Sequence, residues 1–348
     1  MGLGQTCVSD MDLANIAARL VADEKGLLAI DESNGTCNRR FADIGIEQTE
    51  ESRRRWRELI VTTPEIGKSI SGMILYDETM HQATAGGIPF GQVLVNAGIL
   101  VGIKVDTGVK PLAGFPGDSI TEGLDGLRLR LQDYAAIGAS FAKWRAVFSA
   151  GDSMPSTACI AANAHALARY AALCQEAGLV PIVEPELLME GDHDMETCGR
   201  LSRSILEAVF AQLSANKVLL EGMILKPNMV LPGTACREQP TVGQVADATL
   251  KCLLRAVPAA VPGIAFLSGG QSPELACARL NDMNAPFRSR MPWPLAFSYA
   301  RAIQQPALAL WAGQEDNIGL AQASLLHRAR CNHAARRGEY DPSTDSPR

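Results

Sequence analysis

The stretch Met223-Ile-Leu-Lys-Pro-Asn-Met229 joins a short apolar run to a lysine and a proline. Apolar runs of this length, bounded by turn residues, are typical of buried strands. Pro227 cannot donate a hydrogen bond to a sheet and favours an extended conformation at the residue before it, so the strand ends with Lys226 at its carboxyl edge. Because burying an ammonium group is costly without a partner or a lowered pKa, Lys226 either reaches solvent or has a chemical use.

Seven further apolar runs of similar length lie along the chain. The eight runs cover residues 26–31, 72–77, 99–106, 140–148, 179–186, 221–229, 263–268 and 293–298. Helical stretches separate most of them, such as the alanine-rich 157–174 and 193–213, where apolar residues recur every four positions. Strands that alternate with helices predict a parallel sheet, and eight such units predict a closed (β/α)8 barrel, the TIM barrel of the α/β class.

We expect one domain over residues 1–340, formed by this barrel and an N-terminal helix. Residues 341–348 are polar and are predicted to form a short disordered C-terminal tail. The 348 residues are 47% hydrophobic and 20% charged, which is typical of a globular protein.

Charge and hydropathy exclude several classes of partner. The formal net charge of −6 provides no basic field for polyanions, so we expect no nucleic acid as the main ligand. No apolar run approaches membrane-spanning length and the N-terminus lacks a signal-peptide pattern, so no membrane partner is expected. Nine scattered cysteines without a C-x-x-C pair suit a reducing compartment and predict a cytoplasmic location.

The sequence predicts no metal site. Its five histidines form no close ligand pair. The run Gly191-Asp-His-Asp194 has oxygen ligands that suit a hard cation, but aspartates in this setting more often cap a helix.

Chemically reactive side chains stand at the ends of the predicted strands, which is where a (β/α)8 barrel places its active site. These residues are Asp31, Asp77, Lys104, Asp106, Lys143, Arg145, Glu184, Glu186, Lys226, Ser268 and Ser298. Three pairs of them are two residues apart, and a period of two places both members on the same face of a strand. Any one charge could simply mark where a strand leaves the core. The whole set, with both signs of charge, predicts a shared polar mouth.

Two segments have features of phosphate sites. In Phe266-Leu-Ser-Gly-Gly-Gln-Ser272, glycines between a strand and a helix start would let backbone N–H groups approach an anion, and Arg301 could pair with the same phosphate. On the other side, Asp31-Glu-Ser-Asn-Gly-Thr36 offers hydroxyls, with Arg39 and Arg40 beyond. A second phosphate there would make the ligand a bisphosphate, although a turn with solvated arginines explains this segment equally well.

The predicted mouth gathers three lysines and an arginine: Lys104, Lys143, Lys226 and Arg145. Crowded cations lower the pKa of the least solvated amine, and a neutral lysine attacks carbonyls to form an imine that serves as an electron sink. Asp31, Glu184 and Glu186 are carboxylates that could move the protons. This combination predicts cleavage or formation of a carbon–carbon bond beside the ketone of a phosphorylated sugar, without a metal or another cofactor.

With these motifs, the chain resembles the class I fructose-bisphosphate aldolases from near its N-terminus to about Tyr340. The matching stretches are Lys25-Gly-Leu-Leu-Ala-Ile-Asp-Glu-Ser33, Gly102-Ile-Lys-Val-Asp106, Phe141-Ala-Lys-Trp-Arg145, Pro181-Ile-Val-Glu-Pro-Glu186, Leu225-Lys-Pro-Asn-Met229, Phe266-Leu-Ser-Gly-Gly-Gln-Ser272 and Phe297-Ser-Tyr299. The resemblance implies a metal-independent lyase of glycolysis and gluconeogenesis that cleaves fructose 1,6-bisphosphate reversibly to dihydroxyacetone phosphate and glyceraldehyde 3-phosphate. It also implies a homotetramer.

The resemblance further implies a role for each site residue. Lys226 would form the Schiff base, Glu184 would exchange protons with Glu186 beside it, Asp31 would act on the hydroxyl whose deprotonation breaks the carbon–carbon bond, and Lys143 would assist electrostatically. The phosphate near the ketone would rest on Ser268, Gly269, the backbone at Ala300 and Arg301, and the far phosphate on Ser33, Thr36 and Lys104. Arg145, Gly270 and Ser298 are expected to complete the substrate site.

The chain departs from the family pattern at two places. Ala300 stands where the family usually has glycine, which adds a methyl group beside the phosphate. Many members also end in a tyrosine that moves protons on the enamine, whereas this chain ends in Arg348, and Tyr340 matches a position upstream of that tail. Three alternatives stay open: a preference for sedoheptulose 1,7-bisphosphate, a non-catalytic scaffold or binding protein with an aldolase fold, and another Schiff-base barrel enzyme such as a transaldolase.

Overall fold

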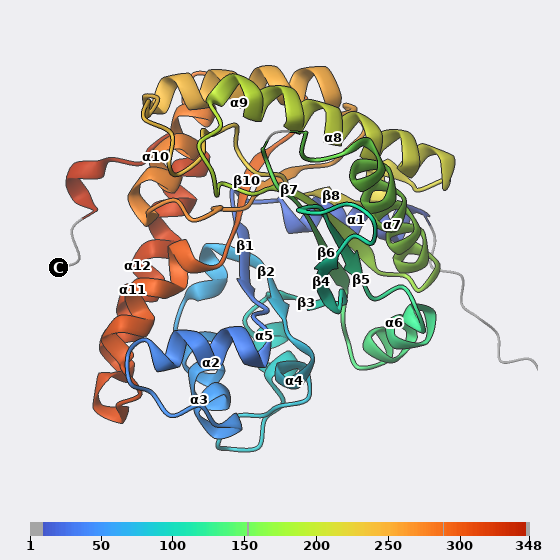
Figure 1. Ribbon diagram of the computed structural model, residues 1–348. Coiled ribbons are helices and arrows are strands. Elements are labelled where there is room, and N and C mark those ends of the chain that lie inside the picture. Colours follow the sequence, from blue (N-terminus) through green and yellow to red (C-terminus); the bar gives the residue numbers. More distant parts are fainter. Residues whose placement is uncertain (1–9, 152, 288, 346–348) are drawn as a thin grey trace, which may run out of the picture.

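Eight parallel strands form a closed barrel in the order β1-β10-β9-β8-β7-β6-β3-β2 (Figure 1). The computed structural model describes residues 10–151, 153–287 and 289–345. The barrel strands are β1 (Gly26–Ile30), β2 (Ile70–Leu75), β3 (Leu100–Lys104), β6 (Phe141–Phe148), β7 (Val180–Leu187), β8 (Ile224–Leu225), β9 (Ile264–Phe266) and β10 (Leu295–Tyr299). Each of the eight predicted runs contributes one strand, so the predicted (β/α)8 barrel is confirmed.

Helices surround the barrel (Figure 1). They are α1 (Asp10–Leu20), α2 (Asn34–Ala42), α3 (Glu50–Val61), α4 (Asp77–Met80), α5 (Phe90–Asn96), α6 (Leu127–Ala136), α7 (Thr157–Glu176), α8 (Met195–Ala215), α9 (Val242–Ala256), α10 (Pro273–Asn284), α11 (Arg301–Trp311) and α12 (Ile318–Arg337). The two helical stretches predicted from periodicity correspond to α7 and α8. Asp194 caps α8 by accepting a hydrogen bond from the backbone N–H of Thr197 at 2.7 Å, as its sequence setting predicts. In the part of the chain that the structure describes, no helix is both long and apolar enough to cross a membrane.

The interior of the barrel is filled by alternate residues of its strands. Leu27, Ala29, Ile74, Phe141 and Ile182 belong to one buried apolar cluster, and Leu13, Ala17 and Leu20 of α1 pack against it. The ring of Phe141 fills the space beside Gly102, where an added Cβ would lie 2.1 Å from that ring. Because side chains alternate between the two faces of a strand, the same inward row continues toward the carboxyl ends of the strands.

The alternation corrects the prediction for Asp77. Strand β2 ends at Leu75, and Ile74 faces the barrel interior, so Tyr76 is the next residue in the inward row. Asp77 instead begins α4, and its side chain is 58% exposed. Its carboxylate accepts a hydrogen bond from the Tyr134 hydroxyl at 2.7 Å. Asp77 therefore belongs to a helix start and not to the end of the second strand.

A short antiparallel hairpin that the sequence did not predict follows β3. It consists of β4 (Gly108–Pro111) and β5 (Ser119–Glu122). Buried Asn163 on α7 supports it, because its side chain accepts from the backbone N–H of Thr121 at 3.2 Å and donates to the carbonyl of Ser119 at 2.8 Å. The strands of the hairpin are short and half-exposed, so they lack the apolar run that identified the barrel strands.

The C-terminal segment differs from the disorder predicted for residues 341–348. Residues Pro342–Thr344 form a 3-10 helix. The side chain of Asp345, which follows this helix, is 3% exposed and contacts Arg328 on α12. That carboxylate pairs with Arg328 and accepts hydrogen bonds from the Tyr340 hydroxyl at 2.5 Å and the Cys331 thiol at 3.2 Å. One carboxylate thus holds the segment to the helix, while residues 346–348 lie outside the described part of the chain.

Replacing Asp345 with asparagine is expected to lower the free energy of unfolding by about 1–3 kcal/mol at neutral pH. Among the described residues, buried Arg328 would then keep the Cys277 sulfur at 3.3 Å and, as its nearest carboxylate, Glu274 at 3.8 Å. Burial raises the pKa of Asp345, but its hydrogen bonds from Arg328 and Tyr340 outweigh burial and lower that pKa to about 2. The contribution is therefore present above the unfolded pKa and is lost as the pH falls through the folded one. Urea unfolding should give a constant difference between the two proteins above about pH 5 and a shrinking one below about pH 4. A difference that grows with acidity would contradict this account.

Candidate active site

A cavity of about 610 Å³ opens at the carboxyl ends of the barrel strands. Every predicted site residue except Gly270 lines it: Asp31, Ser33, Thr36, Lys104, Lys143, Arg145, Glu184, Glu186, Lys226, Ser268, Gly269, Ser298, Ala300 and Arg301. The three pairs spaced by two residues all contribute, because each continues the inward row of its strand. The predicted polar mouth is therefore present as one cavity.

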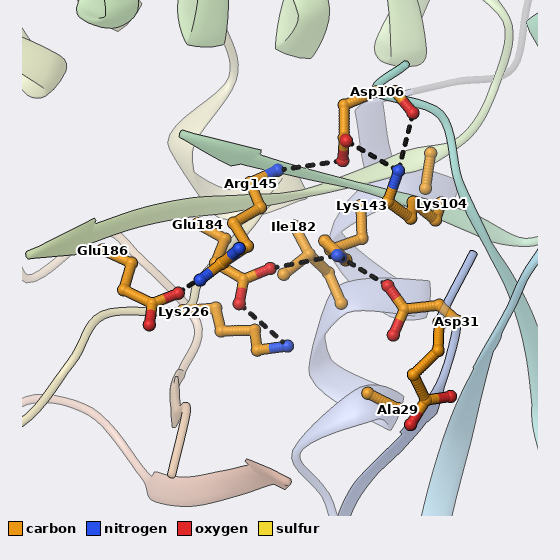
Figure 2. A network of polar contacts seen from close by, with 12 residues as sticks. Ala29, Asp31, Lys104, Asp106, Lys143, Arg145, Ile182, Glu184, Glu186 and Lys226 are labelled. Carbon is orange, nitrogen blue, oxygen red and sulfur yellow. Dashed lines mark hydrogen bonds and ion pairs between the residues drawn. The ribbon is translucent and has the colours of Figure 1, made fainter. Parts of the chain in front are cut away.

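Four buried charged groups form a chain across the floor of this cavity (Figure 2). The Lys226 Nζ atom lies 3.2 Å from Glu184 Oε1, and the Lys143 Nζ atom lies 3.3 Å from Glu184 Oε2. Lys143 also contacts Asp31 Oδ2 at 2.6 Å. The four side chains are between 4% and 10% exposed. Two amines thus alternate with two carboxylates, so each charge has an opposite neighbour.

The charges of this chain fix its protonation. Burial raises the pKa of Asp31, but Lys143 and Lys226 outweigh burial and lower that pKa to about 2. The pKa of Glu184 is lowered in the same way, mainly by Lys143 and Lys226 against burial. Burial lowers the pKa of Lys143, but Asp31 and Glu184 more than compensate and raise it above its usual value. For Lys143 the carboxylates therefore prevail over the effect of crowded cations.

Two further ion pairs lie at the rim of the cavity (Figure 2). The Lys104 Nζ atom lies 2.6 Å from Asp106 Oδ1 and donates to the Asp106 carbonyl at 2.7 Å. The Arg145 Nε atom lies 2.5 Å from Glu186 Oε2. The backbone N–H of Arg145 donates to Asp106 Oδ2 at 3.3 Å, which joins the two pairs. The rim cations thus carry their own counter-ions.

Two helix starts face the cavity from β1 and β10. Ser33 caps α2 by accepting from the backbone N–H of Thr36 at 3.4 Å, and both hydroxyls line the cavity. Across the mouth, Ala300 precedes α11, whose first residue is Arg301. Helix N-termini with hydroxyls or guanidinium groups are suited to hold anions.

The glycine pair after β9 adopts the conformation that a close backbone approach requires. Gly269 and Gly270 have φ of 54° and 83°, values that favour glycine. Gly270 does not line the cavity itself, but a Cβ there would lie 3.7 Å from the Arg301 guanidinium. The Ser298 hydroxyl is buried, and its oxygen has no hydrogen-bond partner in the described part of the chain. It is therefore available to a bound molecule.

Several cavity residues were not assigned by sequence reasoning. They include Glu32, Tyr76, Thr107, Gly108 and Val109. Tyr76 could have been found by continuing the inward row from Ile74, whereas Thr107, Gly108 and Val109 arrive with the unpredicted hairpin. Glu32 stands inside the matched motif, but it follows the end of β1 and carries no periodicity signal.

One group of described residues has the composition of a metal site. His327 Nε2, Cys331 Sγ and Asp345 Oδ1 lie within 4.8 Å of one another. The guanidinium of Arg328 already pairs with Oδ1 of Asp345, so a cation bound there would be repelled by a buried positive charge. Burial and Asp345 also raise the pKa of the Cys331 thiol to about 12, which opposes formation of a thiolate ligand. We interpret this group as the anchor of the C-terminal segment.

Comparison with known proteins places these features in a family. The family described as "Fructose-bisphosphate aldolase class-I" matches residues 12–348. A probable fructose-bisphosphate aldolase class 1 from Xanthomonas campestris is 53% identical over 94% of this chain and 98% of its own length. The muscle-type fructose-bisphosphate aldolase of Lethenteron camtschaticum is 51% identical over 95% of this chain and 92% of its own.

A solved structure agrees with these matches. The fructose-bisphosphate aldolase of Plasmodium falciparum, crystallised with TRAP and a small-molecule inhibitor, superposes with a TM-score of 0.93. It is 44% identical, and the superposition covers 95% of this chain and 96% of that one.

Proposed function

The chain belongs to the class I fructose-bisphosphate aldolase family, and we propose that Lys226 is the lysine that forms its Schiff base. The protein is a metal-independent lyase that cleaves fructose 1,6-bisphosphate reversibly to dihydroxyacetone phosphate and glyceraldehyde 3-phosphate. One observation supports Lys226 above all: its amine is 4% exposed, lines the cavity and lies 3.2 Å from Glu184. A poorly solvated amine beside a proton acceptor has what attack on a ketone requires.

We assign the proton transfers to the two carboxylates of the buried chain. The Lys226 amine, once neutral, adds to the ketone carbon, and Glu184 passes protons so that the carbinolamine loses water and becomes a protonated imine. Asp31, ionised because its pKa is about 2, takes the proton of the hydroxyl on the carbon that becomes the aldehyde, at the far end of the bond to be broken. That bond then breaks, its electron pair moves toward the imine to give an enamine, and the aldehyde half leaves.

The remaining charged groups support this chain. Lys143 contacts both Asp31 and Glu184, so it is placed to stabilise negative charge that moves between them. Glu186, beside Glu184 in the sequence, pairs with Arg145 at the rim. We propose that this pair positions the substrate hydroxyls and not the Schiff base.

Two phosphate sites follow from the two sides of the mouth. Arg301, the Ser268 hydroxyl and the backbone at Gly269 and Ala300 would hold the phosphate near the ketone. Ser33, Thr36 and Lys104 would hold the far one. The exposed side chain of Arg301 supports the first site, as does the buried hydroxyl of nearby Ser298, which has no hydrogen-bond partner among the described residues.

Borohydride trapping tests the catalytic assignment. The protein is mixed with dihydroxyacetone phosphate in EDTA, reduced with borohydride and digested for peptide mass mapping. We expect a single reduced adduct, on Lys226. An adduct on another lysine would overturn the assignment of Lys226, and no adduct on the folded protein would favour the non-catalytic scaffold.

Replacing Lys104 with methionine should distinguish the two phosphate sites. Loss of a charge-assisted contact with phosphate costs about 1.5–3 kcal/mol, so kcat/KM for fructose 1,6-bisphosphate should fall about 10- to 100-fold. Fructose 1-phosphate lacks the far phosphate, and its kcat/KM should change little. Arg301→Gln, in contrast, should weaken both substrates. Equal losses for both substrates in the Lys104 variant would mean that Lys104 does not bind the far phosphate specifically.

The family suggests three properties that the site does not determine. We propose that the protein is a homotetramer, that it works in the cytoplasm, and that residues 1–340 form one cooperative domain with a tail at 341–348. The eight cysteines in the described part of the chain are free thiols, which supports a reducing compartment. Sedimentation velocity would measure the oligomeric state, and localisation of the tagged protein would identify the compartment. A single calorimetric transition would show one cooperative domain. A monomer, a secreted product or two separate transitions would contradict these proposals in turn.

A further inference from the structure

Glu32 binds four structural elements together beside the active site. It follows Asp31 at the end of β1, and its side chain is 10% exposed. The Arg40 Nη1 atom on α2 lies 2.6 Å from Glu32 Oε1, and the Arg57 Nη2 atom on α3 lies 2.9 Å from Oε2. Gln304 on α11 donates to Oε1 at 2.9 Å and to the carbonyl of Ala29 at 2.6 Å.

Three of these four elements carry proposed site groups. The segment after β1 provides Asp31, α2 begins with the hydroxyls of Ser33 and Thr36, and α11 begins with Arg301. The fourth element, α3, contributes no residue to the cavity. A displacement of Glu32 would therefore shift a proposed base and both proposed phosphate sites together. Shifts of about 1 Å at such groups can cost about 100-fold in rate.

Arg57 differs from Arg40, the other cationic partner of Glu32, because it lies outside the cavity. Arg40 and Glu32 line the cavity, whereas Arg57 does not and is only 2% exposed. Its Nη2 atom also donates to the Glu32 carbonyl at 3.4 Å. Its Nη1 atom has no hydrogen-bond partner among the described residues. A buried guanidinium of this kind is costly, so Glu32 is what holds the charge in place.

We propose that Arg57 is a positioning residue for the aldolase reaction, on which it acts through its contacts with Glu32. The proposal rests on the function assigned above. Arg57 contacts Glu32 from outside the cavity. Through this contact it keeps Asp31, the first turn of α2 and the first turn of α11 in fixed positions relative to one another.

The charges around Glu32 make this role measurable. Burial raises the pKa of Glu32, but Arg57 and then Arg40 outweigh burial, so that pKa lies below its usual value. The other groups that face it are Asp31, which raises the pKa, and the Cys37 thiol on α2, which burial keeps neutral. Without Arg57, Arg40 would be the only one of these two cations left to lower the pKa of Glu32 against burial and Asp31. The pKa of Glu32 would rise, and protonated Glu32 would lose an acceptor for Arg40 and Gln304.

The test compares Arg57→Met with Arg53→Met in the full chain. Arg53 lies one turn earlier on α3, is also buried, and pairs with Glu78 at 2.6 Å, which does not line the cavity. In Arg57→Met we expect the acid limb of kcat/KM for fructose 1,6-bisphosphate to move up by about one pH unit. At neutral pH the loss should be about 10- to 100-fold. The Arg53→Met profile should run parallel to the wild type, and Arg57→Lys should restore most of the profile.

A double variant distinguishes the titration of Glu32 from a general loss of structure in Arg57→Met. Arg57→Met combined with Glu32→Gln removes both members of the ion pair and leaves no group to titrate at position 32, while Arg40 keeps neutral acceptors in Gln304 and Gln305. The acid limb should therefore return to the wild-type pH even if the rate stays low. A limb that remains shifted in the double variant would show that another group titrates and would overturn the proposal. So would an Arg57→Met profile that is parallel to the wild type with only a lower melting temperature.

Borohydride trapping of the wild type separates this proposal from the proposed function. Failure to trap on Lys226 in the wild type would overturn the proposed role of Lys226. Normal trapping together with an unshifted profile in Arg57→Met would overturn only the positioning role.

Discussion

Replacing Lys226 with methionine is expected to lower kcat for fructose 1,6-bisphosphate cleavage by about 10⁴-fold or more, since loss of a covalent nucleophile removes the whole intermediate. Without the amine there is no imine, and the electron pair of the breaking bond has no acceptor. The fold should survive, because Glu184 keeps Lys143 at 3.3 Å and methionine fills a similar volume with apolar atoms. Steady-state kinetics and circular dichroism measure the two expectations.

Lys251→Met is the matched control for this prediction. Lys251 lies exposed on α9, on the outer surface of the barrel and away from the cavity. Its replacement should leave kcat and trapping unchanged. Activity within about tenfold of the wild type in Lys226→Met would mean that another amine carries the reaction.

The barrel and the floor of its mouth could be predicted because one physical rule governs both. Side chains alternate along a strand, so the row that contains Ile182 inside the barrel continues to Glu184 and Glu186 above it. The same rule aligns Lys143 with Arg145. Charges that continue an inward apolar row have only the mouth to occupy, which is why a single sequence was sufficient to locate them.

The predictions were less complete where the chain leaves this regular alternation. Asp77 was misplaced because the exact end of β2 decides which residue faces inward, and a difference of one residue reverses the face. The hairpin of β4 and β5 was missed because its strands are short and partly exposed. The partners of Glu32 are out of reach of such reasoning, since Arg57 and Gln304 are brought to it by the packing of α3 and α11.

The electrostatic state of the mouth also required the structure. The sequence shows that cations are crowded there, but not that Asp31 and Glu184 flank Lys143 on both sides. Distances of 2.6 and 3.3 Å decide that Lys143 is a stabilised ammonium group. A lysine in that state cannot serve as the nucleophile, which supports the choice of Lys226 over its neighbour.

Lys143→Met should have the largest effect on stability together with a large effect on rate. It leaves two buried carboxylates without their main counter-ion, and breaking a buried ion pair in this way costs about 3–5 kcal/mol. The cleavage rate should fall by about 10³-fold, the size found when a preorganised charge is removed from an active site. Lys143→Arg, which keeps the charge, should recover part of the stability but less of the rate, because the larger planar guanidinium cannot place its charge between Asp31 and Glu184 as the compact ammonium does.

The pH dependence of that stability loss identifies its cause. Lys143 lowers the pKa of both Asp31 and Glu184, so their stabilising contribution is present above their unfolded pKa values and disappears as the pH falls through the folded ones. In Lys143→Met both pKa values rise, and the folded variant takes up protons at a higher pH than the wild type does. The stability deficit should therefore be greatest at and above about pH 7 and should shrink steadily below about pH 5 in urea unfolding experiments. A deficit that is the same at every pH would mean that Lys143 stabilises the barrel by packing, and the charged chain from Lys226 to Asp31 would lose its electrostatic explanation.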